Sequence, residues 1–280
     1  MNVRRIKELA EQYGLGISPR RLGQHFLLDE RILARIAGVL GAKSGDRILE
    51  IGAGLGALTE QLLATGATVY GVEKDPRYLR VLTDRFRDRT SLQLVRSDIL
   101  RVDLGSYALG EPGSLLVIGN IPYSLTSPIL EFLVHQRIWV RRAVLTIQKE
   151  VATRIVAQPG GRDYSSLTLL VQVAFRPSVA FTIHPGAFYP QPKVVSAVLC
   201  LDPLPAPPVP ADEEEALLVF IRKLFTHRRK TVANAILGAG WEGKKERLLE
   251  ILGRAGIDSS RRPETFGLGE LIELNRRLHP

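Results

Sequence analysis

Short apolar runs alternate with amphipathic segments over residues 46–158, and this alternation predicts an α/β fold. The runs end in glycine, acidic or amide residues, as buried parallel strands often do. An N-terminal helical segment, with Ile32, Ile36 and Leu40 at helical spacing, precedes them. Strands are predicted at 46–54, 68–75, 92–99, 114–120 and from 142 onward, with helices at 57–67, 76–88 and 127–136. This order indicates a Rossmann-like, doubly wound parallel sheet.

The pattern changes in the second half of the chain. Residues 166–204 are β-rich and interrupted by prolines, which predicts antiparallel strands that complete the sheet. The proline-rich stretch 203–213 is typical of a semi-rigid linker. Only helical patterns follow it, at 213–240, 244–256 and 268–280. We therefore predict a Rossmann-like domain over 1–202, a linker over 203–213 and a small all-α C-terminal domain over 214–280.

Four successive strand ends carry residues suited to a ligand. Gly52 and Gly54 follow the first strand, Glu73 ends the second, Asp98 the third and Asn120 the fourth. Ligands of open α/β sheets bind at these carboxyl ends, where glycines let the backbone approach closely. The GxGxG spacing differs from the GxGxxG of dinucleotide sites. These four strand ends resemble those of class I S-adenosylmethionine-dependent methyltransferases. Glu73 would then bind the ribose hydroxyls of the cofactor, and Asp98 would accept a hydrogen bond from its adenine amino group. Each residue alone is equally compatible with a cap or a turn.

The turn Asn120–Tyr123, with sequence NIPY, resembles the [ND]-x-P-[YF] motif of transferases that methylate amino groups of bases or amides. The lone pair of an exocyclic adenine amine is delocalised into the ring. The Asn120 side-chain oxygen and a carbonyl of the Ile121–Pro122 segment can each accept an N–H and stabilise the charge that develops on nitrogen. Pro122 fixes the turn, and Tyr123 offers a stacking face for a flipped base. The alternative is a plain Asn-Pro turn after a strand.

Five longer segments of the chain indicate a narrower family. They resemble, in order, parts of the KsgA-type small-subunit ribosomal RNA adenine dimethyltransferases: RLGQHFL (21–27), QKEVATR (148–154), YSSLTLLVQ (164–172), PGAFYPQPKVVSAV (185–198) and FTHRRKTVANAI (225–236). The resemblance also makes Phe188 a second aromatic wall opposite Tyr123; a core position is the alternative. Position 25 departs from the family, which usually has Asn there. The cofactor contacts that the resemblance implies are His25, Leu27, Gly52, Glu73, Asp98 and Asn120.

Charge and composition agree with a nucleic-acid partner. The formal net charge is +9, which favours a polyanion, although a merely basic protein is the alternative. Five cations without an intervening acid are predicted on the first C-terminal helix as contacts to RNA phosphates, with a solvated helix face as the alternative; these are Arg222, Lys223, Arg228, Arg229 and Lys230. The one cysteine, Cys200, is predicted to be a buried thiol. We expect no metal site, no membrane span and a cytoplasmic location.

The resemblance implies a monomeric enzyme that uses S-adenosyl-L-methionine and releases S-adenosyl-L-homocysteine. Its implied reaction is N6,N6-dimethylation of two adjacent adenosines in the 3′-terminal hairpin loop of small-subunit (16S) rRNA, on a pre-ribosomal 30S particle, with a role in ribosome biogenesis. Three alternatives stand beside it. They are a related large-subunit rRNA methyltransferase, a non-catalytic nucleic-acid-binding factor on the same fold, and, least favoured by the glycine spacing, a dinucleotide oxidoreductase.

Overall fold

The computed structural model describes residues 2–15 and 25–278, which form two compact units. The first unit contains residues 1–152 and 176–203, and the second contains 153–175 and 204–280. The sequence assigned 153–175 to the Rossmann-like domain, whereas the structure groups this stretch with the C-terminal helices. No described helix is both long enough and apolar enough to cross a membrane.

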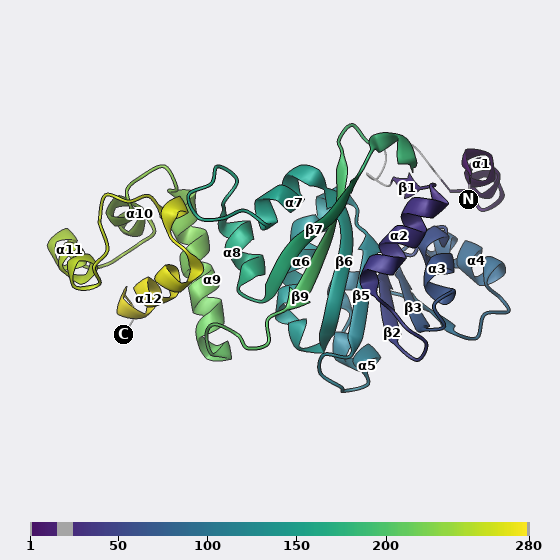
Figure 1. Cartoon of the computed structure of the whole chain (residues 1–280), viewed down its shortest axis with the longest axis horizontal. Helices are drawn as coiled ribbons and strands as arrows, with labels where there is room; N and C mark the ends of the chain where they lie inside the picture. The colour runs from purple at the N-terminus through teal and green to yellow at the C-terminus, as the bar shows by residue number, and fades with distance from the viewer. Residues whose placement is uncertain (1, 16–24, 279–280) are drawn as a thin grey trace. The chain divides into compact units, whose positions relative to one another are not determined.

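The first unit is built on a seven-stranded sheet with the order β4-β3-β2-β5-β6-β9-β7 (Figure 1). Strands β4 to β6 of this order pair in parallel, and β9 is antiparallel to β6. This arrangement confirms the predicted doubly wound sheet and its antiparallel completion. The strands are β2 (Arg47–Ile51), β3 (Thr68–Glu73), β4 (Leu92–Arg96), β5 (Leu115–Asn120), β6 (Val140–Gln148), β7 (Phe175–Ile183) and β9 (Ser196–Pro203).

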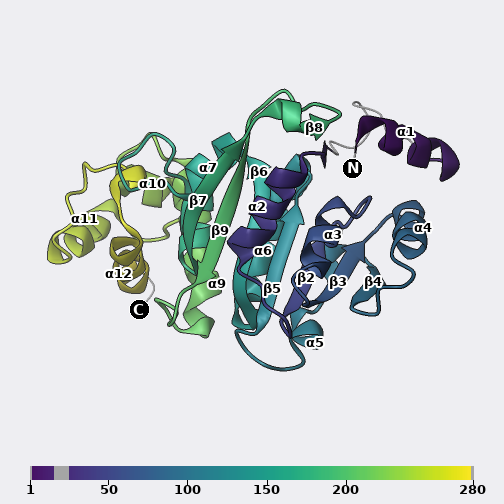
Figure 2. The same cartoon turned by 45° about the vertical axis from the view of Figure 1, so that its right-hand side comes forward.

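Helices flank this sheet, and a separate two-stranded ribbon pairs β1 (Phe26–Leu27) with β8 (Phe188–Tyr189) (Figure 2). The helix α4 starts at Pro76, at its first position, because proline needs no N–H partner there. The helices are α1 (Val3–Gln12), α2 (Glu30–Leu40), α3 (Ala57–Leu63), α4 (Pro76–Arg85), α5 (Leu104–Ala108), α6 (Thr126–His135) and α7 (Lys149–Ile155).

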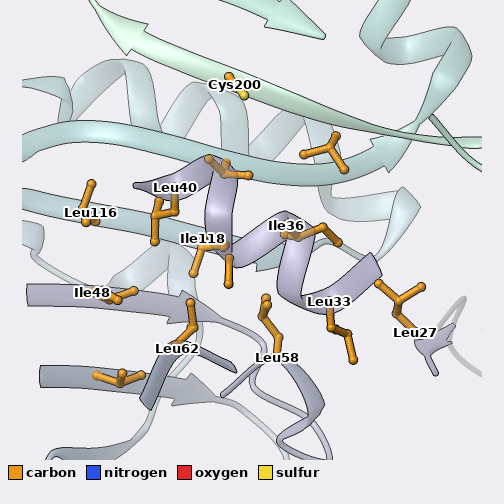
Figure 3. Close-up of a cluster of buried hydrophobic side chains, with 14 of the residues drawn as sticks. Leu27, Leu33, Ile36, Leu40, Ile48, Leu58, Leu62, Leu116, Ile118 and Cys200 are labelled. Atoms are coloured by element: carbon orange, nitrogen blue, oxygen red, sulfur yellow. The ribbon is translucent and has the colours of Figure 1, made fainter. Parts of the chain in front are cut away.

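A hydrophobic cluster of the first unit lies between α2, α3 and the central strands (Figure 3). Leu33, Ile36 and Leu40 project from one side of α2, as their spacing predicts, and meet strand residues such as Ile118. Cys200 joins this cluster at 7% exposure, and burial raises the pKa of its thiol. Cys200 is therefore a buried structural thiol, as predicted.

The second unit consists of helices and loops throughout its described residues, apart from the first residue of β7. Its helices are α8 (Ser166–Gln172), α9 (Ala211–Thr226), α10 (Val232–Gly238), α11 (Lys245–Arg254) and α12 (Leu268–Leu278). The predicted helical stretch 213–240 is broken after Thr226, and Thr231 caps α10 by accepting from Asn234 N at 3.5 Å.

The prediction of β structure from residue 166 was wrong for α8. Ser165 and Thr168 form a capping box at the start of this helix, and Thr168 Oγ1 also donates to Arg154 O at 2.6 Å. A short apolar run bounded by polar residues does not distinguish a buried strand from a buried helix. Here the capping residues, rather than the apolar run, determine the local structure.

Gly119 on β5 is required for close packing beside the Asn120 turn. A Cβ at this position would lie 2.8 Å from Ile51 O and 2.9 Å from Ile51 Cβ on the neighbouring strand. We expect Gly119→Ala to lower the free energy of unfolding by about 1–3 kcal/mol through overpacking. Chemical denaturation measures this change. The matched control is Gly38→Ala in α2, where a Cβ meets nothing within 4 Å; it should gain about 0.5–1 kcal/mol, and equal effects would contradict the packing argument.

Candidate active site

A cavity of about 770 Å³ lies at the carboxyl ends of β2 to β5 in the first unit. We call it the strand-end cavity. Nine of the ten residues that the sequence assigned to the cofactor or to catalysis line it: His25, Leu27, Gly52, Gly54, Glu73, Asp98, Asn120, Pro122 and Tyr123. Residues 21–24 of the predicted RLGQHFL segment lie outside the described residues. The parallel order of the strands brings Gly52, Glu73, Asp98 and Asn120 to one edge of the sheet. His25 and Leu27 reach the same cavity from the segment at β1.

Glu73 lines the strand-end cavity and accepts hydrogen bonds from the backbone of two turns, one after β2 and one after β3. Its carboxylate accepts Gly54 N at 3.0 Å on Oε2 and Asp75 N at 2.9 Å on Oε1. Gly52 and Gly54 have φ of 69° and 53°, a left-handed conformation that favours glycine. Burial raises the pKa of Glu73, and the backbone N–H donors oppose that shift. Each carboxylate oxygen retains a lone pair with which it can accept a further donor.

Asp98 caps a turn and also lines the strand-end cavity. Its Oδ1 accepts Leu100 N at 3.2 Å, so the side chain caps the short 3₁₀ turn Ile99–Arg101. Its Oδ2 lies 2.9 Å from Lys74 Nζ, and this ammonium group holds the pKa of Asp98 below its ordinary value. The side chain nevertheless lines the cavity. Asp98 is thus an ionised acceptor at the cavity wall as well as a cap.

The Asn120 amide is fixed by a hydrogen bond to the N-terminal segment. Asn120 Nδ2 donates to His25 O at 2.8 Å. Because a carbonyl can only accept, this contact assigns the NH₂ group to the His25 side, and no described residue donates to Oδ1. The next turn closes when Leu125 N donates to Pro122 O at 2.8 Å. The side-chain oxygen of Asn120 therefore remains available as an acceptor.

Tyr123 begins the 3₁₀ turn Tyr123–Leu125, and its ring is anchored at the hydroxyl end. The hydroxyl lies 2.9 Å from Ser196 Oγ on β9, and burial raises the pKa of Tyr123. The ring centroid is 5.5 Å from that of His25, with 35° between the planes. His25 Nδ1 is 2.6 Å from Pro190 O, so Nδ1 must carry the proton. These contacts hold a neutral phenol and an imidazole at the same wall.

Phe188 does not occupy the predicted position opposite Tyr123. It is 4% exposed, packs in the cluster of α2 and α3, and does not line the strand-end cavity. The cause is the ribbon pairing of β8 with β1, which sets Phe188 directly opposite Leu27. Residues paired in this way project to the same face. Both side chains belong to that cluster, although Leu27 also lines the strand-end cavity. The core alternative is the correct one in this structure.

Among the cavity residues that the sequence prediction did not include, Glu50 and Thr146 are polar and buried. Glu50 is 2% exposed and accepts Thr59 Oγ1 at 2.6 Å; burial raises its pKa to about 8. Thr146, opposite Asn120 on β6, is 1% exposed, and its hydroxyl has no hydrogen-bond partner in the described part of the chain. An acid inside an apolar strand was a visible signal for Glu50. Nothing local distinguishes Thr146, because its position depends on the pairing of β5 with β6.

The predicted row of cations divides into two groups. Arg222 and Lys223 lie on α9, but Arg228, Arg229 and Lys230 follow its end, so the prediction of one helix was wrong. Arg228 lies 2.7 Å from a carboxylate oxygen of Glu264 and also donates to a backbone carbonyl. It is half-buried, whereas the other four cations are exposed. Arg228 therefore stabilises the second unit, and the exposed four remain candidates for phosphate contacts.

Comparison with protein families gives a match over nearly the whole chain. The model of the family described as ribosomal RNA adenine dimethylase covers residues 18–273. The chain belongs to the ribosomal RNA adenine dimethylase family. Its relatives include the ribosomal RNA small subunit methyltransferase A of Geobacter metallireducens, 40% identical over 95% of this chain and 97% of the relative. The protein of the same name from Anaeromyxobacter sp. (strain K) is 42% identical over 97% of each chain.

Solved structures agree with the family assignment. A dimethyladenosine transferase from Plasmodium falciparum is 26% identical, with a TM-score of 0.76 over 90% of this chain and 98% of that one. The 23S rRNA methyltransferase ErmE, at 24% identity and a TM-score of 0.67, covers 91% of this chain and all of its own. The latter likeness concerns the fold alone. This member of the adenine dimethylase family therefore has the class I methyltransferase fold that the strand ends predicted.

The raised pKa of Glu50 predicts a dependence of stability on pH. In the unfolded chain a glutamate ionises near its ordinary 4.5, whereas folded Glu50 stays protonated to about 8. Its contribution to stability is therefore complete below about 4.5 and lost as the pH rises through about 8. We expect the unfolding free energy of Glu50→Gln, relative to wild type, to rise by up to about 1.4 kcal/mol per pH unit within this window.

Urea unfolding at pH 5.5 and 7.5 measures this difference. Glu60→Gln on α3 is a suitable control, because Glu60 is an exposed carboxylate that pairs with Arg85. Its effect should be similar at both pH values. A Glu50→Gln difference that does not change with pH would show that Glu50 is ionised in the folded protein.

Proposed function

We propose that this protein transfers methyl groups from S-adenosyl-L-methionine to N6 of two adjacent adenosines in the 3′-terminal hairpin loop of small-subunit rRNA, two to each. The observation that carries the proposal is the Asn120 turn. The amide is held by the His25 carbonyl so that its oxygen is available beside the Tyr123 ring. Family membership and the names of the relatives support the substrate.

The residues of the strand-end cavity fit S-adenosylmethionine, which when bound supplies a methyl group on a sulfonium sulfur. Both oxygens of Glu73 already accept backbone N–H groups and can each accept a ribose hydroxyl as well. Asp98, kept ionised by Lys74, can accept an adenine amino group. A Cβ at Gly52 would meet nothing within 4 Å, so the backbone there borders open space. The Thr146 hydroxyl, which has no partner among the described residues, adds a buried polar group to the cavity lining.

The acceptors at the turn account for activation of an unreactive amine. Two N–H groups of adenine N6 would donate to Asn120 Oδ1 and to a backbone carbonyl. Pro122 O already accepts Leu125 N, so we assign the second acceptor to Ile121 O. These hydrogen bonds turn the nitrogen lone pair out of conjugation and stabilise the positive charge on N6. The proton can leave after methyl transfer, so no strong general base is needed.

The second methylation places a different demand on the same residues. Monomethyladenine has one N–H left and can donate to only one of the two acceptors. The amine must therefore rotate in the cavity between transfers. The Tyr123 ring, held at its hydroxyl by Ser196, offers a fixed stacking surface for the base during this rotation.

The finer assignments follow from the same proposal. We infer that the exposed cations Arg222, Lys223, Arg229 and Lys230 contact phosphates of the rRNA in a pre-ribosomal 30S particle. We also infer that the protein acts as a cytoplasmic monomer in small-subunit biogenesis. Arg228, which is paired with Glu264, is omitted from the phosphate contacts.

The direct test is methyl transfer from labelled S-adenosylmethionine to unmethylated small ribosomal subunits, with the modified nucleoside identified by mass. Dimethyladenosine in the 3′-terminal hairpin supports the reaction, the substrate and the site together. Methylation of large-subunit rRNA instead would assign the chemistry to another RNA. Cofactor binding without transfer to either subunit would support a binding factor on the same fold.

Asn120→Ala separates catalysis from cofactor binding. The variant loses one oriented acceptor, which contributes about 3 kcal/mol to the transition state. We expect turnover to fall roughly 100-fold or more, while the affinity for S-adenosylhomocysteine stays within about tenfold. Single-turnover methylation and calorimetric titration measure the two quantities. Near-wild-type turnover would contradict the proposed role of Asn120.

Glu73→Ala tests the ribose contact. Loss of both carboxylate oxygens removes the hydroxyl acceptors and frees Gly54 N and Asp75 N, so S-adenosylhomocysteine affinity should fall at least tenfold. Unfolding measurements on the same variant separate lost binding from lost structure. The control is Asp84→Asn on α4. Asp84 is an exposed acid that accepts a hydrogen bond from the Tyr13 hydroxyl, and it does not line the cavity. Unchanged affinity in a folded Glu73→Ala protein would reject the ribose contact.

A further inference from the structure

A second cavity, of about 720 Å³, lies entirely within the second unit. We call it the C-terminal cavity. Buried apolar residues of α9, α10 and α12 line it, namely Phe220, Ile236 and Leu278, together with the buried polar residue Asn275. Trp241 and Gly243, from the loop between α10 and α11, form one wall. This volume is within the range of sites for small organic ligands.

The wall of this cavity contains an unsatisfied donor. The indole N–H of Trp241 is buried and has no hydrogen-bond partner among the residues that the structure describes. Gly243 packs so closely on this edge that a Cβ there would lie 2.5 Å from Nε1. A buried donor without a partner destabilises the free protein.

The rim of the cavity is cationic. Lys223 and Arg247 line it and are exposed, and neither side chain forms an ion pair within the described chain. Several other arginines of this unit are paired with acids, as Arg261 is with Glu270. The acid among the lining residues, Glu242, is outnumbered by these two cations. Buried apolar side chains, an aromatic wall and unpaired cations together match a base that carries a phosphate.

We propose that the C-terminal cavity binds a single unstacked nucleotide of the RNA substrate. The base would stack on Trp241 over the buried apolar side chains, and its phosphates would contact Lys223 and Arg247. RNA as the partner rests on the proposed function. The site itself is separate from the strand-end cavity and makes no contribution to the methyl-transfer chemistry. It would add a point of attachment that recognises exposed, unpaired RNA.

Tryptophan fluorescence of the full-length chain can test this site. The chain has two tryptophans, so Trp139→Phe leaves Trp241 as the only reporter. The probes are the hexanucleotide rA₆, 5′-AMP and inorganic phosphate, with saturating S-adenosylhomocysteine present to occupy the other cavity. We expect saturable quenching by rA₆ and AMP but not by phosphate, and weaker rA₆ binding at higher salt.

Charge variants made in the Trp139→Phe background sharpen the test. Lys223→Gln and Arg247→Gln should each weaken rA₆ binding at least threefold. The matched control, Arg254→Gln on α11, removes a cation that pairs with Glu250 outside the cavity and should leave the affinity unchanged. Absence of quenching by rA₆ up to 1 mM (about the weakest affinity of interest), or quenching by phosphate alone, would overturn the proposal. Quenching by an acidic amphipathic peptide but not by RNA would also overturn it.

A kinetic measurement distinguishes this site from the active site. Trp241→Leu keeps an apolar wall but removes the stacking face. With small ribosomal subunits as substrate, it should raise KM at least threefold and leave kcat within twofold. An unchanged KM would reject the site even if the enzyme methylates as proposed. If no subunit is methylated, the fluorescence titration still decides the nucleotide proposal.

Discussion

The active site depends on one constraint, namely that parallel strands in a single sheet end at the same edge. The order β4-β3-β2-β5 converts four separate stretches of chain into a spatial row of Asp98, Glu73, the Gly52–Gly54 turn and Asn120. No contact between these side chains is needed to align them, because the backbone ladder does so. The row offers carboxylate and amide oxygens together with open backbone. A cofactor with ribose, adenine and sulfonium parts requires such a sequence of acceptors.

The same edge concentrates polar groups that are costly to bury. Glu50 and Glu73 lose hydration there, and Thr146 keeps a hydroxyl without a partner. Such groups lower the stability of the free protein, yet they lie where a polar ligand would compensate them. The hydrogen bond from Asn120 to the His25 carbonyl fixes the orientation of the amide in the free protein. Preorganisation of this kind stabilises charge without reorganisation in the transition state.

Most features with local causes were predictable from the sequence, whereas features with distant causes were not. Each of the strands β2 to β5 ends where the sequence changes from apolar to polar residues. This local signal allowed Glu73 and Asn120 to be assigned correctly to the cavity. The burial of Phe188 follows from the pairing of β1 with β8, segments about 160 residues apart. The ion pair of Arg228 requires Glu264, which the chain brings close from another loop. The helix α8 was missed for a local reason, since Ser165 and Thr168 were not recognised as a cap.

The anchor beneath Tyr123 has a consequence for how substrate range can evolve. Ser196, which holds the Tyr123 hydroxyl, is fully buried on β9, an antiparallel strand outside the parallel row. The orientation of the Tyr123 ring is therefore set from the protein interior, by a residue that no ligand can reach. With Tyr123 stacking the base as proposed, substitutions at Ser196 would alter which bases lie flat on the ring without changing any residue of the cavity wall. Selection for a different acceptor would then have a route through the interior that leaves the residues proposed for methyl transfer untouched.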